Sequence, residues 1–209
     1  MNDTNPNYIY LFDQLGIDFD EVKSCVETGT HEGVGSFTFS TYFDEVVTIE
    51  LSEELHSRCL ELYKEDTKIT FIQGKSTDKL TDVVANIQHP YLLFLDAHGS
   101  GGNTAFDPKV GTYGSPAIEE LECVKSNPPS WIILDDLREF DDPNKNYPSR
   151  EQIVQKVAEL GEYEDPIAVN VGSKDALIEL LHKHKISAPP EPWNHRLEGV
   201  PQWFCFKLA

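Results

Sequence analysis

The sequence has no apolar run long enough to span a membrane. A transmembrane helix needs about 20 consecutive apolar residues, and no window of the 209-residue chain approaches that length. The first ten residues, MNDTNPNYIY, lack the basic flank and apolar run of a secretion signal. We therefore expect a cytoplasmic protein that has no membrane partner.

Positive charge is also scarce. The chain has 17 Lys and Arg residues against 36 Asp and Glu residues, which gives a net charge of −19. A field of this sign repels phosphate backbones and anionic lipids, so neither nucleic acid nor a membrane is an expected partner. The acids are scattered rather than gathered in a tail, which is typical of a solvated surface and leaves some of them for metal binding.

Cysteines are few and far apart. The four, Cys25, Cys59, Cys123 and Cys205, form no C-x-x-C pair. A zinc ribbon and a thioredoxin-type site are therefore not expected, and neither is a disulfide framework in a cytosolic chain of this size.

Two nucleotide-binding signatures are absent as well. The dinucleotide fingerprint G-x-G-x-x-G does not occur. Gly74-Lys75-Ser76 resembles the end of a phosphate-binding loop, but the pattern needs a glycine where the chain has Ile69. A phosphate loop is therefore excluded.

What the chain does contain is a regular alternation of short apolar runs and amphipathic segments. The apolar runs are rich in Val, Ile and Leu, as in buried strands, and the segments between them have helical spacing. The rhythm predicts an α/β fold: a doubly wound, Rossmann-like, mainly parallel sheet of seven strands with helices on both faces and an antiparallel last strand. The expected strands are 24–27, 46–50, 69–73, 91–96, 131–135, 167–171 and 202–208, and the expected helices are 34–43, 52–64, 77–87, 116–125 and 149–160.

The pattern is that of one domain covering residues 1–209. We expect an N-terminal arm or helix over 1–22, a cofactor-binding core over 24–140, and the C-terminal half of the sheet over 141–209. Two long irregular stretches, 99–115 and the Pro-rich 185–201, interrupt it. Loops of this length are often lids or binding loops, so we expect the acceptor pocket there.

The stretch CVETGTHEGVGSF, residues 25–37, lies where the first strand leads into a helix. Glycines at Gly29, Gly33 and Gly35 let a ligand approach the backbone, and ligands of open α/β sheets bind beyond the strand ends. Glu50 ends the second strand, where an acid can bind ribose hydroxyls, and Glu27 is placed to take an ammonium group. An ammonium, a carboxylate and a ribose together describe S-adenosylmethionine. The alternative is that these acids only cap surface turns.

Further acids follow the fourth and fifth strands. Asp96 ends the fourth strand, in FLDAH, and Asp135 and Asp136 end the fifth, in IILDD. Neighbouring strands lie ~5 Å apart, so three carboxylates would meet at one rim, where like charges favour a bound cation such as Mg²⁺, Ca²⁺ or Mn²⁺. His98 could then remove the proton of a metal-bound hydroxyl as general base. Alternatively, the Asp pair caps a helix or binds Arg138, and His98 only holds its loop.

The runs VETGTHEGVGSF, VVTIELSEEL, LLFLDAHGSGGNT and WIILDDLREF resemble a class I S-adenosylmethionine-dependent methyltransferase of the small bacterial and phage type. The resemblance covers residues 24–140, and within the class the sequence is similar to metal-dependent O-methyltransferases. It implies that Glu27, Gly29, Thr30 and Gly33 surround the methionine part of the cofactor and that Glu50 holds the ribose.

The resemblance further implies a metal site at Asp96, Asp135 and Asp136. We expect His98 and Asp96 to be the catalytic residues, with Asp96 also at the cofactor site. One position departs from the family. Where Gly-Asp-Ser is common, with the acid near the adenine amine, this chain has Gly-Lys75-Ser76. Lysine cannot accept that hydrogen bond, so we expect Ser76 or backbone to replace the acid.

The expected function is therefore O-methylation of a small hydroxylated acceptor, such as a sugar or phenol, with S-adenosylmethionine as the methyl donor. A divalent ion is a second candidate cofactor. The alternative is a non-catalytic domain that binds S-adenosylmethionine or S-adenosylhomocysteine, or a scaffold. A nucleotide-sugar or nicotinamide enzyme is a third option, against which the missing fingerprint counts. The sequence leaves open whether the chain forms a homo-oligomer.

Overall fold

The computed structural model describes residues 4–99, 105, 107–109, 111, 114–142, 144–170, 172 and 201–209. The expected Pro-rich loop lies outside these residues apart from its last position, and the loop over 99–115 is described only in part. Within the described residues, no helix combines the length and apolar character that crossing a bilayer requires.

Seven strands form one sheet in the order β3-β2-β1-β4-β5-β7-β6. The first five pair in parallel, whereas β7 runs antiparallel to both β5 and β6. The predicted fold class, including the antiparallel last strand, is thereby confirmed. The strands are β1 (Ser24–Thr28), β2 (Glu45–Glu50), β3 (Ile69–Gln73), β4 (Tyr91–Leu95), β5 (Trp131–Leu134), β6 (Ile167–Asn170) and β7 (Pro201–Lys207).

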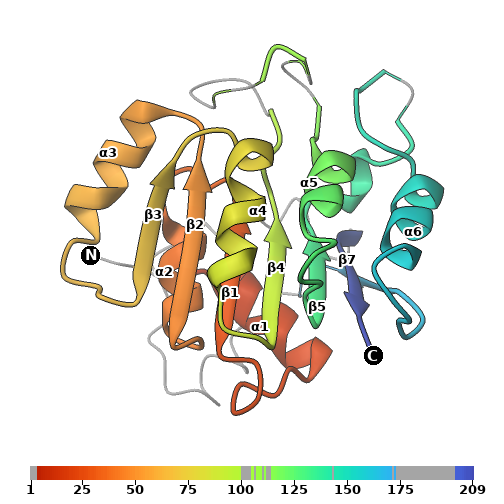
Figure 1. Cartoon of the computed structure of the whole chain (residues 1–209), viewed down its shortest axis with the longest axis horizontal. Coiled ribbons are helices and arrows are strands. Elements are labelled where there is room, and N and C mark those ends of the chain that lie inside the picture. The colour runs from red at the N-terminus through yellow and green to blue at the C-terminus, as the bar shows by residue number, and fades with distance from the viewer. Residues whose placement is uncertain are drawn as a thin grey trace.

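Helices cover both faces of the sheet (Figure 1). One buried cluster joins the sheet to α1 and α2, and another joins it to α4, α5 and α6, while α3 packs on β2 and β3. The helices are α1 (Pro6–Leu15), α2 (Val34–Ser40), α3 (Glu53–Leu62), α4 (Ser76–Asn86), α5 (Ala117–Cys123) and α6 (Arg150–Ala158), with a 3₁₀ turn η1 (Leu137–Glu139).

Local signals explain where the helices begin. The Asn5 side chain caps α1 by accepting the Asn7 N–H at 3.0 Å, and Pro6 occupies the first turn. As predicted, Ser52 caps α3, accepting the Leu55 N–H at 3.3 Å. The observed ends differ from the predicted ones by up to three residues, and the largest difference is α2, which ends at Ser40.

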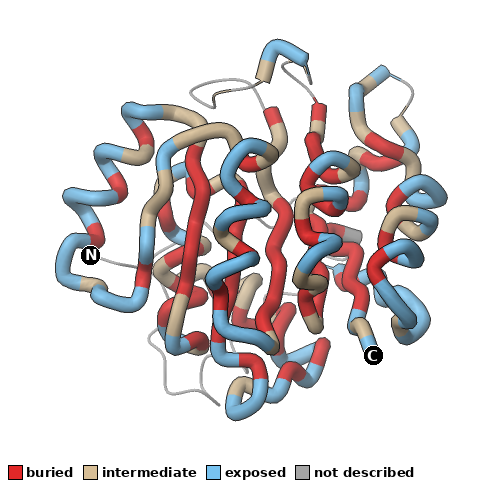
Figure 2. The backbone as a smooth tube through the Cα atoms, in the orientation of Figure 1, coloured by how far each residue is buried: buried red, intermediate tan, exposed pale blue. Residues whose placement is uncertain are grey.

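The central strands are buried on both faces. Every residue of β1, β4 and β5 is buried, and Figure 2 shows β2 and β4 as continuous buried stretches between exposed helix surfaces. This explains why the sequences of β4 (YLLFL) and β5 (WIIL) are unbroken apolar runs rather than alternating ones. Since helices cover both faces, a ligand reaches the sheet at the strand ends.

The connections of β1 and β4 create an opening at these ends. After β1 the chain continues towards β2, and after β4 it continues towards β5 on the other side. In open α/β sheets the crevice at such a switch point is the usual place for a ligand. The carboxyl ends of β1 and β4, which pair directly, are therefore where a functional site is expected.

Candidate active site

A cavity of about 280 Å³ opens at the carboxyl ends of the parallel strands. It is slightly smaller than the ~300 Å³ at which ligand pockets commonly begin. Three of the predicted site residues, Glu27, Thr30 and Gly33, do not line it. The predicted residues that line it are Gly29, Glu50, Ser76, Asp96, His98, Asp135 and Asp136.

Gly29 forms the floor of the cavity. Its φ of +86° is in the left-handed region, and a Cβ there would lie 2.7 Å from the Asp96 carbonyl carbon and 2.9 Å from the Ala97 nitrogen. Its N–H donates to the Ile49 carbonyl at 2.9 Å. Only glycine combines this conformation with so close an approach. The turn therefore presents bare backbone between β1 and β4.

Glu50, at the end of β2, lies in the cavity wall with 6% of its surface exposed. Its Oε2 accepts the His31 N–H and its Oε1 accepts the Ser52 N–H, both at 2.8 Å. Two backbone donors thus fix the carboxylate. Because each carboxylate oxygen has two lone pairs, capacity remains for hydroxyl donors of a ligand.

Glu27, in contrast, is buried beneath the cavity. The hydroxyls of Ser36 and Thr48 donate to its Oε2, the latter at 2.6 Å, and it is 2% exposed. Burial raises the pKa of Glu27 to about 8, although the two hydroxyl donors act in the opposite direction. Thr30 belongs to the same buried group, since its hydroxyl lies 2.6 Å from that of Thr48.

Gly33 has a structural task. It precedes α2 with a φ of +78°, and a Cβ there would lie 2.5 Å from the ring of Tyr63. Its place among the residues around the methionine part stays a prediction, because the structure brings it to the Tyr63 ring rather than to the cavity.

His98 connects two of the strand-end acids. Its Nδ1 lies 3.0 Å from Asp96 Oδ1, and its Nε2 lies 2.9 Å from Asp136 Oδ2. Burial acts to lower the pKa of His98, but the bonds to Asp136 and Asp96 outweigh it and raise that pKa well above its usual value. A carboxylate oxygen faces each ring nitrogen, an arrangement that favours the imidazolium form of His98, which has no lone pair left to take a proton.

The acids after β5 are held by two further side chains. Asp136 Oδ1 accepts from Arg138 at 2.6 Å and from Gln202 at 2.9 Å. Asp135 Oδ1 accepts the Asp136 N–H at 2.8 Å and the Gln202 amide at 2.6 Å. Burial and the neighbouring acids Asp96 and Asp136 together raise the pKa of Asp135 well above its usual value. Burial also acts to raise the pKa of Asp136, but its hydrogen bonds and the nearby cations outweigh burial and lower that pKa.

This arrangement bears on the predicted metal ligands, Asp96, Asp135 and Asp136. They meet at one rim, but the imidazole, the guanidinium and the Gln202 amide already bind one oxygen of Asp96, one of Asp135 and both of Asp136. Among the described residues, no group of acidic, His or Cys side chains is arranged to hold a metal ion. The acids as placed fit a protonated histidine rather than a divalent cation, so the metal prediction is not supported.

On the side of β3, Ser76 begins α4 and is 7% exposed. Behind it, Glu120 of α5 is 1% exposed, and burial raises the pKa of Glu120 to about 7. Here Lys75 Nζ forms an ion pair with Asp107 Oδ2 at 2.6 Å, and both residues line the cavity. The sequence did not indicate Asp107, because Lys75 and Asp107 are distant in the chain and meet only in the tertiary structure.

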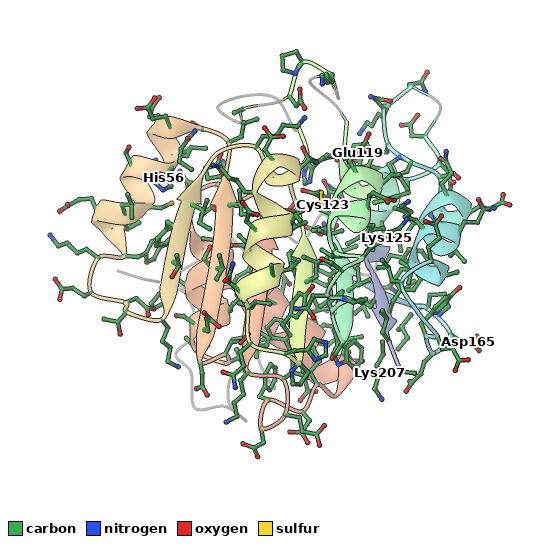
Figure 3. All side chains as sticks on the ribbon, viewed as in Figure 1. His56, Glu119, Cys123, Lys125, Asp165 and Lys207 are labelled. Carbon is green, nitrogen blue, oxygen red and sulfur yellow. The ribbon has the colours of Figure 1, made fainter. Side chains whose placement is uncertain are left out.

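Other charged groups lie on the outer surface. Lys125 lies just after α5 (Figure 3). It pairs with Glu122 at 2.8 Å and with Glu159 at 2.7 Å. His56, on α3, faces the Phe71 carbonyl at 3.4 Å. Neither group lines the cavity, so the candidate chemistry is concentrated at the rim.

No protein-family model matches the sequence, and no curated protein sequence matches it. Solved structures do match. A SAM-dependent methyltransferase from Archaeoglobus fulgidus is 14% identical, with a TM-score of 0.52 over 95% of this chain and 91% of that one. The O-methyltransferase from Bacillus cereus in complex with SAH is 15% identical, with a TM-score of 0.51 over 100% and 83%. Precorrin-6y C5,15-methyltransferase from Geobacter metallireducens is 13% identical, with a TM-score of 0.53 over 96% and 86%.

These neighbours identify the class of fold. The chain has the Rossmann-like fold of class I S-adenosylmethionine-dependent methyltransferases, as the resemblance in its sequence implied. At identities this low the likeness shows the fold alone, and the activity must be argued from the cavity.

Proposed function

We propose that the protein is a methyltransferase that binds S-adenosylmethionine in the cavity at the switch point and methylates a small molecule. The observation that carries this proposal is that Gly29 and Glu50 line the same cavity. A bare backbone turn and a carboxylate fixed by two N–H groups face the same cavity. The likeness to methyltransferase structures, one of them in complex with SAH, supports it.

In this proposal Glu50 accepts hydrogen bonds from the ribose hydroxyls, and the aminoacyl part of the cofactor approaches the Gly29 turn. Glu27 supports that turn from below through Ser36 and Thr48, rather than taking the ammonium group directly as the sequence suggested.

The bound cofactor would supply a methyl group on a sulfonium, and transfer in line needs no covalent enzyme intermediate. The chain's task is to position the acceptor and to receive its proton. His98 cannot receive it while both ring nitrogens donate, so we assign that role to Asp135. Its Oδ1 is held by the Asp136 N–H and the Gln202 amide, whereas its Oδ2 has no hydrogen-bond partner among the described residues, and the side chain lines the cavity. His98 acts as a positioning residue that keeps Asp96 and Asp136 in place.

The acceptor in this proposal is a small hydroxylated molecule, a sugar or a phenol. Methylation of a hydroxyl requires a proton acceptor within reach, which Asp135 provides on the cavity side of β5. The experiment is turnover of methyl-labelled S-adenosylmethionine with a library of such acceptors. We expect Asp135→Asn to lose turnover and to retain S-adenosylhomocysteine binding. Binding without turnover of any acceptor would point to the non-catalytic binding domain, and absence of binding would reject both.

Assistance by a divalent ion would require His98 to leave its two carboxylates. We therefore expect turnover to be unchanged after EDTA treatment. A tenfold loss that MgCl₂ restores would instead return Asp96, Asp135 and Asp136 to a metal site.

A further inference from the structure

The cavity has a second charged group, far from the His98 cluster. Lys75 follows β3 and Asp136 follows β5, and three strands separate β3 from β5. The side chains of Lys75 and Asp107 are 28% and 15% exposed, so the ion pair between them is partly withdrawn from water. Asp107 is held in turn by the Lys109 N–H, which donates to its Oδ1 at 3.0 Å.

The position of Lys75 is unfavourable on local grounds. It immediately precedes α4, where the helix dipole favours negative charge, and it provides no side-chain cap for the helix. Local rules are most often broken at functional positions. Asp107 neutralises the lysine from another loop, and the pair as a whole faces the cavity.

The register of the sheet places this pair beside the ribose end of the cavity. Glu50 is level with Gln73 on β3, and the Gly74 N–H donates to the Glu50 carbonyl at 2.8 Å. Lys75 is the next residue. Lys75, Ser76 and Asp107 line the same cavity as Glu50. The inference rests on the proposed function: with the ribose on Glu50, we place the base of that nucleoside against Lys75, Ser76 and Asp107.

We propose that the Lys75–Asp107 ion pair reads the edge of the bound base and selects adenine by its amino group. A carboxylate only accepts hydrogen bonds and an ammonium only donates them. Side by side, they match the amino donor and the adjacent ring-nitrogen acceptor of adenine. Hypoxanthine has a keto acceptor and a ring N–H donor at the same two positions, so it presents the opposite pattern.

The test is calorimetric binding of S-adenosylhomocysteine and S-inosylhomocysteine to the full chain. We expect the wild type to bind the adenosyl ligand at least about tenfold more tightly, the effect of losing hydrogen bonds to charged groups. In Asp107→Asn the ratio should fall towards one, because an amide both donates and accepts. In the charge-swapped chain, Lys75→Asp with Asp107→Lys, the preference should move to the inosyl ligand. The ratio does not depend on the fraction of protein that is folded.

The matched control is Asp44→Asn. Asp44 pairs with Lys23 at 3.5 Å, at the start of β2 and away from the rim, so its loss should leave the ratio unchanged. A ratio of one in the wild type, or the same ratio in wild type and Asp107→Asn, would overturn the inference. A wild type that binds neither ligand would overturn the proposed function itself.

Discussion

Glu27 and Glu50 are the same residue type at the ends of adjacent parallel strands, and both are almost completely buried. Only Glu50 lines the cavity. Backbone N–H groups hold Glu50, whereas the hydroxyls of Ser36 and Thr48 hold Glu27. Two similar acids therefore have different tasks: one faces a ligand site, and the other supports the loop beneath it.

The register of the sheet produces this difference. Glu27 is level with Thr48 on β2, two residues before Glu50. At a rise of about 3.3 Å per residue, Glu27 lies roughly 6–7 Å deeper than Glu50 along the strand direction. The same alternation puts both on one face of the sheet, so depth rather than direction separates them.

The largest expected effect on cofactor binding comes from the turn at Gly29, which follows the strand that carries Glu27. Gly29→Val would place a side chain against the Asp96 backbone at a positive φ, which combines strain with overpacking. We expect S-adenosylhomocysteine binding to fall by more than about a hundredfold, as costs of 1–3 kcal/mol each imply. The control is Gly16→Val, which has a φ of +60° but no atom within 4 Å; an equal loss of binding in the control would mean that strain alone is responsible.

The next effect separates the two acids directly. Glu50→Gln keeps the shape of the side chain but removes the charge that would bind ribose hydroxyls. We expect affinity for S-adenosylhomocysteine to fall by about 1.5–3 kcal/mol in calorimetry, with a small change in melting temperature. An unchanged affinity would remove Glu50 from the cofactor site and leave the two acids alike.

Glu27→Gln should instead change the pH dependence of stability. The pKa of Glu27 is about 8 in the folded chain against 4.5 as its ordinary value. The unfolded chain therefore releases this proton first, and the folded state loses stability as pH rises between these values. We expect the melting temperature of the variant to match the wild type at pH 4 and to exceed it by several degrees at pH 9. A difference that is the same at both pH values would contradict the buried position.

The smallest effect concerns Thr30. Thr30→Val removes the contact between the hydroxyls of Thr30 and Thr48, and a buried hydrogen bond contributes about 1 kcal/mol. We expect a small loss of stability in urea unfolding and no change in S-adenosylhomocysteine affinity. A loss of affinity as large as that of Glu50→Gln would place Thr30 at the binding surface after all.

Local sequence was sufficient for much of the fold. The apolar run before Asp96 is a fully buried strand, and the Ser52 cap is where it was expected. These features depend on residues that are neighbours in the chain. For the same reason the ends of β2, β4 and β5 could be recognised as carrying acids.

Long-range partners could not be predicted in this way. Gln202 reaches Asp135 and Asp136 from β7, 67 and 66 residues away. His98 was expected to act as a base, and the structure places acids from two strands at its two nitrogens. Nothing near His98 in the chain reports the second of these acids.

By itself the sequence determined the alternation of strands and helices and the presence of acids at the strand ends, because these follow from hydrophobic periodicity and local capping. Only the tertiary structure decided which acid faces the cavity, which supports a loop and which pairs with a histidine. How deep each acid lies, which groups it contacts and whether it is protonated depend on the register of the strands and on contacts between distant segments. Burial then strengthens the effect of each contact on the pKa of the acid.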